Sequence, residues 1–95
     1  MEKIIQLSNG QAKGYSVYAG PFNVLFCTTG KGMVACGAFN IQALAKFDYP
    51  AVRVQSPVKT IEDVLDAPAA EINELAACLG IKEGMSGREC LEKMF

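Results

Sequence analysis

The sequence predicts an α+β domain, a two-layer sandwich in which three helices pack against a mostly antiparallel sheet of about five strands. Two observations predict this fold class. Short apolar segments separated by turn residues fill the first half of the chain, and helix-start signals follow later. The length, 95 residues, is that of one domain, and no repeat or low-complexity linker divides it. We therefore expect residues 1–95 to form a single domain.

Five segments have the apolar patterns of short strands. Turn residues that include glycine separate the first four of them, at residues 8–10, 20–21 and 30–32. Because these turns are short, we expect the first four strands to form an antiparallel meander, with the second strand pairing on the first. The five segments are residues 2–8, 15–19, 23–29, 33–36 and 51–55.

Two short helices are predicted from their capping residues. Asn40 is a good N-cap for a helix that ends near residue 47. At residues 86–89 a serine and a glutamate stand three positions apart and form a capping box. This box predicts a final helix with Leu91 and Met94 on its inner face.

A longer helix is predicted between these two. Thr60 and Asp63 have the spacing of a capping box, and Pro68 suits the first turn of the long helix that follows. Gly80 would end that helix as a left-handed C-cap. Its buried stripe would consist of Ile72, Leu75, Ala76 and Leu79.

Charge and hydropathy exclude two classes of partner. The net charge is −1 and the nine lysines and arginines are spread along the chain, so we expect no nucleic-acid binding. Apolar runs such as residues 33–38 are far shorter than the roughly 20 residues that cross a bilayer. Polar residues also stand where a secretory signal would carry its apolar core. We therefore expect no membrane span and a cytoplasmic location.

The absence of histidine limits the chemistry that this chain can perform. Without histidine there is no Ser-His or Cys-His relay, and the four cysteines include no C-x-x-C pair. The sequence predicts no metal site and no cofactor, and it does not favour an enzyme. Because 51% of the residues are hydrophobic in so short a chain, we expect part of this surface to be buried in a homo-oligomer.

Cys36 and Gly37 form the sharpest candidate site. A cation or a helix N-terminus can activate a thiol, and an adjacent glycine allows a substrate or another backbone to approach. Cys36, however, lies four residues ahead of the predicted cap at Asn40, so the helix dipole contributes little. A buried cysteine beside a packing glycine is the favoured interpretation, ahead of ligand contact and of covalent catalysis.

Lys31 and Arg53 complete the candidate ligand-binding or interface residues, together with Cys36, Gly37 and Asn40. The turn that contains Lys31 offers hydroxyls, amides and a cation for an anion, although a plain hairpin turn is favoured. Arg53 stands between two valines, and a structural ion pair with a carboxylate is favoured over anion binding.

The pairing of Cys27 with Cys36 depends on the length of the hairpin loop. A two-residue loop at residues 31–32 would place the two cysteines directly opposite each other, and a three-residue loop would place them out of register. A redox pair is therefore conceivable, but two free thiols are favoured in a reducing compartment.

Three segments of the chain resemble the YunC-like family of small uncharacterised proteins. These segments are residues 60–65, residues 79–89 with their Gly-Met-Ser-Gly-Arg-Glu string, and residues 32–40 with the Cys-Gly pair. The resemblance covers the chain from about residue 29 onward. It implies a compact two-layer α+β fold and a domain of unknown function, and it brings no catalytic residues. Phe39 and Pro57 depart from the pattern, which has leucine and glycine at these positions.

These observations predict a non-enzymatic, homo-oligomeric module that binds a small molecule or a partner near residues 31–40 and Arg53. The first alternative is a cysteine-dependent enzyme or thiol redox protein that uses Cys36. The second is a structural subunit of a larger complex.

Overall fold

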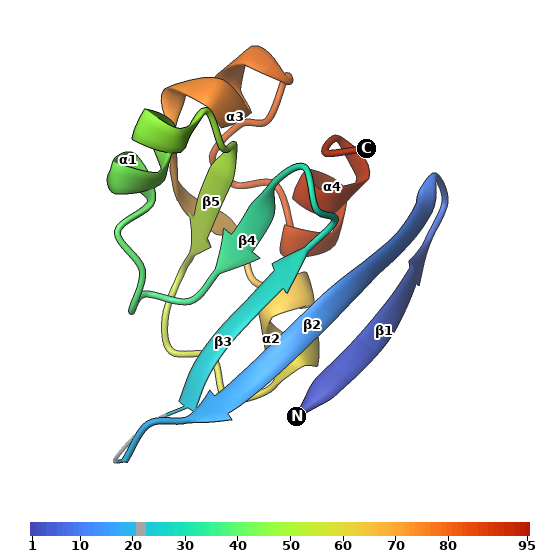
Figure 1. The fold of residues 1–95 in the computed structure, drawn as a ribbon, viewed down its shortest axis with the longest axis vertical. Helices are drawn as coiled ribbons and strands as arrows, with labels where there is room; N and C mark the ends of the chain where they lie inside the picture. Colours follow the sequence, from blue (N-terminus) through green and yellow to red (C-terminus); the bar gives the residue numbers. More distant parts are fainter. Residues whose placement is uncertain (21–22) are drawn as a thin grey trace.

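Strands from both halves of the chain form one sheet, in which they lie side by side in the order of the sequence (Figure 1). The structure is a computed structural model, and it describes residues 1–20 and 23–95. Within these residues the sheet has six strands. The strands are β1 (Glu2–Leu7), β2 (Gly10–Tyr18), β3 (Asn23–Thr28), β4 (Met33–Ala35), β5 (Ala51–Val54) and β6 (Ala69–Ile72). The predicted α+β class and the antiparallel meander of the first four strands are confirmed.

The pairing of β5 on β4 is parallel, unlike the pairings elsewhere in the sheet. A parallel neighbour requires a crossover connection, and this is supplied by α1 (Ile41–Leu44) and the 3₁₀ turn η1 (Ala45–Phe47). The Asn40 side chain accepts hydrogen bonds from the Gln42 and Ala43 amides, which confirms the predicted N-cap.

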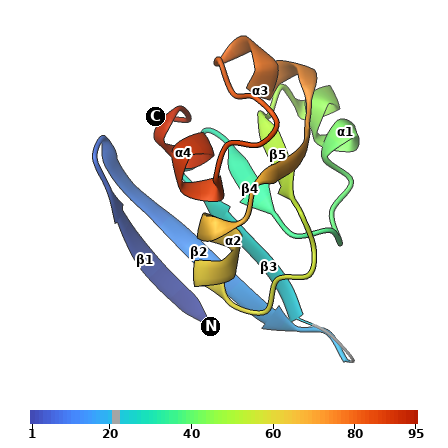
Figure 2. The same ribbon diagram turned by 180° about the vertical axis from the view of Figure 1, so that it is seen from behind.

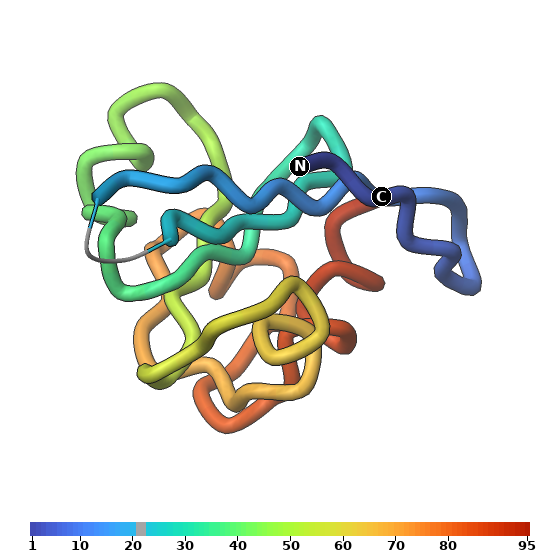
Figure 3. Tube along the Cα trace, turned by 90° about the horizontal axis from the view of Figure 1, so that it is seen from below, coloured from blue at the N-terminus to red at the C-terminus, as the bar shows by residue number. Residues whose placement is uncertain are grey.

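The helices cover the two faces of the sheet unequally (Figures 2 and 3). The described residues form three further α-helices, α2 (Ile61–Asp66), α3 (Glu74–Cys78) and α4 (Gly87–Glu92). Both predicted capping boxes are present, at Thr60 and at Ser86. The helices α2 and α4 and Ala76 of α3 close the larger core, which includes Leu25, Val34, Val52, Val64 and Leu91. On the opposite face α1 closes a smaller core with Met33, Ala35 and Ala51.

The long helix predicted through Pro68 is wrong. The chain ends α2 at Ala67 with extended backbone, which is the conformation that a following proline favours. Residues 69–72 then form β6 on the edge of the sheet, and α3 begins only after Asn73. Leu79, placed in the buried stripe by the sequence, is 42% exposed. Pairing with β5 therefore outweighed the helical spacing of this segment.

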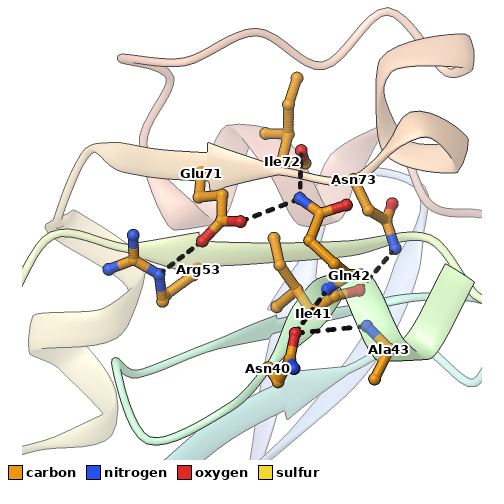
Figure 4. Close-up of polar contacts among 8 residues, drawn as sticks. All are labelled: Asn40, Ile41, Gln42, Ala43, Arg53, Glu71, Ile72 and Asn73. Carbon is orange, nitrogen blue, oxygen red and sulfur yellow. Dashed lines mark hydrogen bonds and ion pairs between the residues drawn. The ribbon is translucent and has the colours of Figure 1, made fainter.

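Asn73 joins elements that lie far apart in the sequence (Figure 4). Its side chain is 1% exposed and uses all of its hydrogen-bonding capacity. The Oδ1 atom accepts from the amides of Ala51 (3.1 Å) and Ala76 (3.0 Å). The Nδ2 atom donates to the carbonyls of Ile41 (3.2 Å) and Tyr49 (2.9 Å). One amide therefore ties β5, α3 and both ends of the crossover together.

Replacing Asn73 with alanine is expected to lower the free energy of unfolding by about 2–5 kcal/mol, because four backbone groups lose their partner in a buried place. Urea denaturation measures the loss. Asn9→Ala is the matched control: its exposed amide makes one hydrogen bond, to the Glu92 carbonyl at 3.1 Å, and we expect a loss below about 1 kcal/mol. Equal losses in the two variants would contradict the structural role of Asn73.

Candidate functional site

A hollow of about 380 Å³ lies where the parallel strands β4 and β5 leave the sheet. Because these strands are parallel, the residues that follow them meet at one end of the sheet, beyond the carboxyl ends of β4 and β5. Asn23 reaches the same end, since β3 is antiparallel to β4 and begins there. The hollow is lined by Asn23, Cys36, Gly37, Ala38, Ser56, Pro57 and Val58.

We call this feature the carboxyl-end hollow, and the side chains that line it are small and uncharged. Its polar groups are the Ser56 hydroxyl, the Asn23 amide and the Cys36 thiol, together with backbone groups, and Pro57 and Val58 add apolar surface. The volume is near the lower end of the range of small-molecule sites, roughly 300–1,000 Å³. The arrangement can bind and orient a small molecule through a few hydrogen bonds.

Gly37 allows the two loops of the hollow to approach each other. A Cβ atom at Gly37 would lie 2.8 Å from the Ser56 hydroxyl oxygen, which is closer than ordinary packing allows. The glycine beside Cys36 therefore admits another segment of this chain. Ser56, Val58 and Asn23 were not singled out by the sequence; the signal that could have found them is the parallel pairing of β4 with β5.

Cys36 is held between the hollow and the core. The residue is 6% exposed and packs in the larger core. Its amide donates to the Leu25 carbonyl at 3.0 Å, and its sulfur accepts from the Leu25 amide at 3.4 Å. The thiol thus serves as a packing group and as part of the lining of the hollow.

Cys27 does not face Cys36 across the hairpin. Thr29 still bonds to Gly32, so the two-residue turn consists of Gly30 and Lys31, and Cys27 is opposite Val34. Gly30 has a φ of +92°, which glycine adopts readily. The four cysteines are free thiols. Burial is the main cause that raises the pKa of the Cys27 thiol to about 12, with a smaller contribution from Glu62.

Lys31 lies at the opposite end of β4 from the hollow. It is exposed in the turn, whose hydroxyls are used within the protein itself. Thr28 Oγ1 accepts from the Gly30 amide (3.0 Å), and Thr29 Oγ1 accepts from the Lys31 amide (3.2 Å). Thr29 Oγ1 also donates to the Met94 carbonyl. These bonds explain the turn as a structural hairpin.

Arg53 is opposite Ala35 of β4 and so lies on the face of the smaller core, whereas the Cys36 side chain packs in the larger core on the other face. Figure 4 shows Arg53 beside Glu71. Its Nε donates to a Glu71 oxygen at 3.0 Å, and the second Glu71 oxygen accepts from Gln42 Nε2 at 2.9 Å. The hydrogen bond from Gln42, followed by that from Arg53, lowers the pKa of Glu71. The structure therefore groups Cys36 with Gly37 in the hollow and places Lys31, Asn40 and Arg53 elsewhere.

A second hollow, of about 290 Å³, lies beside α2. Asn23 lines it as well, so the two hollows are neighbours. Lys3 and Glu62, which line it, form an ion pair with each other. This hollow is also lined by Met1, Ser16, Lys59, Thr60 and Ile61.

No helix in residues 1–20 and 23–95 is long and apolar enough to cross a membrane. In the same residues no three histidine, cysteine, aspartate or glutamate side chains are grouped so that they could hold a metal ion.

The fold and the hollow define a small α+β domain with a hollow large enough for a small molecule at the carboxyl ends of two parallel strands. Residues 35–94 match the model of a family described as Domain of unknown function (DUF1805), and the chain belongs to this family. The chain is 38% identical to the uncharacterised protein YunC of Bacillus subtilis over 76 residues, which is 76% of this chain and 74% of that protein. The predicted YunC-like resemblance is confirmed.

The fold is also that of a solved relative. A crystal structure of a protein of unknown function, TA1206 from Thermoplasma acidophilum, matches with a TM-score of 0.88 and 30% identity. The match covers 100% of this chain and 94% of that chain. The family match includes both loops of the carboxyl-end hollow, whereas Lys31 and Asn23 precede it.

Alkylation of the native protein with iodoacetamide is expected to modify Cys78 alone, because Cys78 is exposed and the other three cysteines are buried. Mass spectrometry counts the modified thiols, and denatured protein, in which all four react, is the control. Modification of Cys36 as fast as Cys78 would show an accessible, reactive thiol in the hollow.

Stability is expected to fall as pH rises above about 9, because burial raises the pKa of Cys27 to about 12 and that of Cys90 to about 11. Above the ordinary thiol pKa the unfolded chain loses these protons while the folded protein keeps them. Urea denaturation between about pH 8 and pH 10.5 measures the slope. Cys27→Ala is the comparison, and an unchanged slope in that variant would contradict the assignment.

Proposed function

We propose that this protein is a non-enzymatic module that binds a small molecule in the carboxyl-end hollow. The observation that supports the proposal is the meeting of two loops, residues 36–38 and 56–58, at the ends of the parallel strands β4 and β5. In open sheets with parallel strands, ligands bind beyond the carboxyl ends of the strands.

The chemistry of the lining favours a neutral ligand. The residues that form the hollow are uncharged, so the lost hydration of a charged group would not be offset by a counter-charge there. Ser56 and Asn23 supply hydrogen-bonding side chains, and Pro57 and Val58 supply apolar contact. A compact molecule with a few polar groups and an apolar side suits this combination.

Cys36 acts in this proposal as a ligand contact rather than as a nucleophile. A catalytic or redox role would need a thiolate and, for redox chemistry, a second thiol. Cys27, the nearest partner in the hairpin, is out of register, and its raised pKa keeps it protonated. The observations therefore support ligand contact over the thiol enzyme.

We also propose that copies of the chain associate with one another in the cytoplasm. Half of the residues are hydrophobic, and several large apolar side chains are exposed, among them Ile4, Tyr18 and Phe47. Association with a second copy would remove such surface from water. A structural subunit of a larger assembly would use the same surface. The mass of the purified species distinguishes the two hypotheses, because a homo-oligomer has a multiple of the mass of one chain.

Filling the hollow with Ala38→Trp is expected to abolish ligand binding without unfolding the protein, because Ala38 is exposed and lines the hollow. The measurement is a two-dimensional amide NMR titration with a library of neutral fragments. We expect shifts of the amide signals of residues 36–38, 56 and 58 in the parent protein and at least a tenfold weaker response in the variant.

Ala43→Trp is the matched control, since Ala43 is an exposed alanine on α1 that does not line the hollow. It should respond to the fragments as the parent protein does. Shifts that persist in Ala38→Trp, or that lie at Lys31 or Arg53 instead, would overturn the location of the site.

A further inference from the structure

The two edges of the sheet differ in how their backbone groups are used. At the β6 edge, the Ala69 amide donates to the Met85 carbonyl (2.7 Å), and the Ala69 carbonyl accepts from the Gly84 amide (2.9 Å). Gln42 also donates to the Ile72 carbonyl. The β6 edge is therefore closed by neighbouring segments of the same chain.

The β1 edge is open. Met1 and Ser16 exchange two hydrogen bonds, of 2.8 and 2.9 Å, so they form a hydrogen-bonded pair of the antiparallel ladder. The alternation of such pairs directs the backbone groups of residues 3, 5 and 7 toward β2. The amides and carbonyls of Glu2, Ile4 and Gln6 point away from the sheet. Among residues 1–20 and 23–95, no helix or strand lies beside β1 on that side (Figures 1 and 2).

We propose that β1 pairs antiparallel with β1 of a second copy, about a two-fold axis at Ile4. Ile4 then exchanges two hydrogen bonds with Ile4 of the partner subunit, and Glu2 lies opposite Gln6 of the partner subunit. The two sheets become one continuous sheet across the axis. This inference rests on the self-association proposed above and names the surface that produces it, but it does not depend on ligand binding in the hollow.

The residues of β1 favour this register over its neighbours. Only pairing about Ile4 uses all three outward residues of both copies. A shift toward the N-terminus would place Lys3 against Lys3 of the partner subunit, and a shift the other way would leave Glu2 without an outward partner. In the proposed register a carboxylate meets an amide that can donate to it, and no like charges are opposed.

The side chains of β1 favour a second copy on both faces of the strand. Ile4 is 59% exposed on the face opposite α2, and the axis brings two such side chains together. On the other face Lys3 is already paired with Glu62 and would lie beside Ile5 of the partner subunit. Exposed edge strands commonly recruit another strand, and a two-fold axis is the usual symmetry of self-association.

Sedimentation velocity over a range of concentrations tests the proposal with Ile4→Pro. The Ile4 amide points outward, so proline removes no bond between β1 and β2 and is tolerated on an edge strand. We expect a dimer for the parent protein and an association constant more than about thirtyfold lower for Ile4→Pro. Circular dichroism confirms that the variant is folded.

Charge variants at residue 6 test the register itself. Gln6→Lys places a cation opposite Glu2 of the partner subunit and should strengthen the dimer about threefold to thirtyfold, whereas Gln6→Glu should weaken it by a similar factor. Val17→Lys is the control, because Val17 is exposed on the same face but away from the edge, and it should leave the dimer unchanged.

Each other outcome overturns the proposal in a distinguishable way. A monomeric parent protein would refute both the self-association and the edge pairing. It would not bear on the proposal that the hollow binds a ligand. A dimer that is insensitive to Ile4→Pro, or that is lost in Val17→Lys, would place the contact on another surface. A monomer that binds a strand of a different protein through β1 would refute a second copy as the occupant.

Discussion

The fold depends on one buried side-chain amide, that of Asn73, which makes all the hydrogen bonds it can. Asn73 accepts from Ala51 and Ala76 and donates to Ile41 and Tyr49, so a single buried side chain links the start of the crossover, its end and α3. The crossover is what allows β5 to lie parallel to β4. Because of this parallel pairing, the loops that follow β4 and β5 lie at the same end of the sheet and form the carboxyl-end hollow. The candidate site is thus a consequence of how the crossover is anchored.

Local signals predicted the elements whose formation is itself local. The glycine turns predicted the first four strands, and Asn40, Thr60 and Ser86 predicted three helix starts that the structure shows. Residues 69–72 could not be assigned in this way, because their strand exists only through pairing with β5. Their spacing fits a helix equally well, and the decisive partner is remote in the sequence. The role of Asn73 is hidden for the same reason, since three of its four partners belong to or border α1 and β5.

The candidate site was half visible in the sequence. Cys36 and Gly37 form a recognisable pair, and the structure places both in the hollow. Ser56 supplies the opposite wall and carries no local signal. Lys31 and Arg53 were grouped with Cys36 by proximity and residue type. A strand separates Lys31 from the hollow, and the two-residue alternation of a strand puts Arg53 on the other face.

Native-state amide hydrogen exchange tests most directly whether Asn73 anchors the crossover. The Ala51 and Ala76 amides donate to Asn73 Oδ1. Ala51 is the first residue of β5, and Ala76 belongs to the short helix α3. If the anchor holds, both amides exchange only through global unfolding, as slowly as the most protected amides of β3. Exchange of both amides through local opening, with free energies well below that of global unfolding, would show that the crossover moves independently of the sheet.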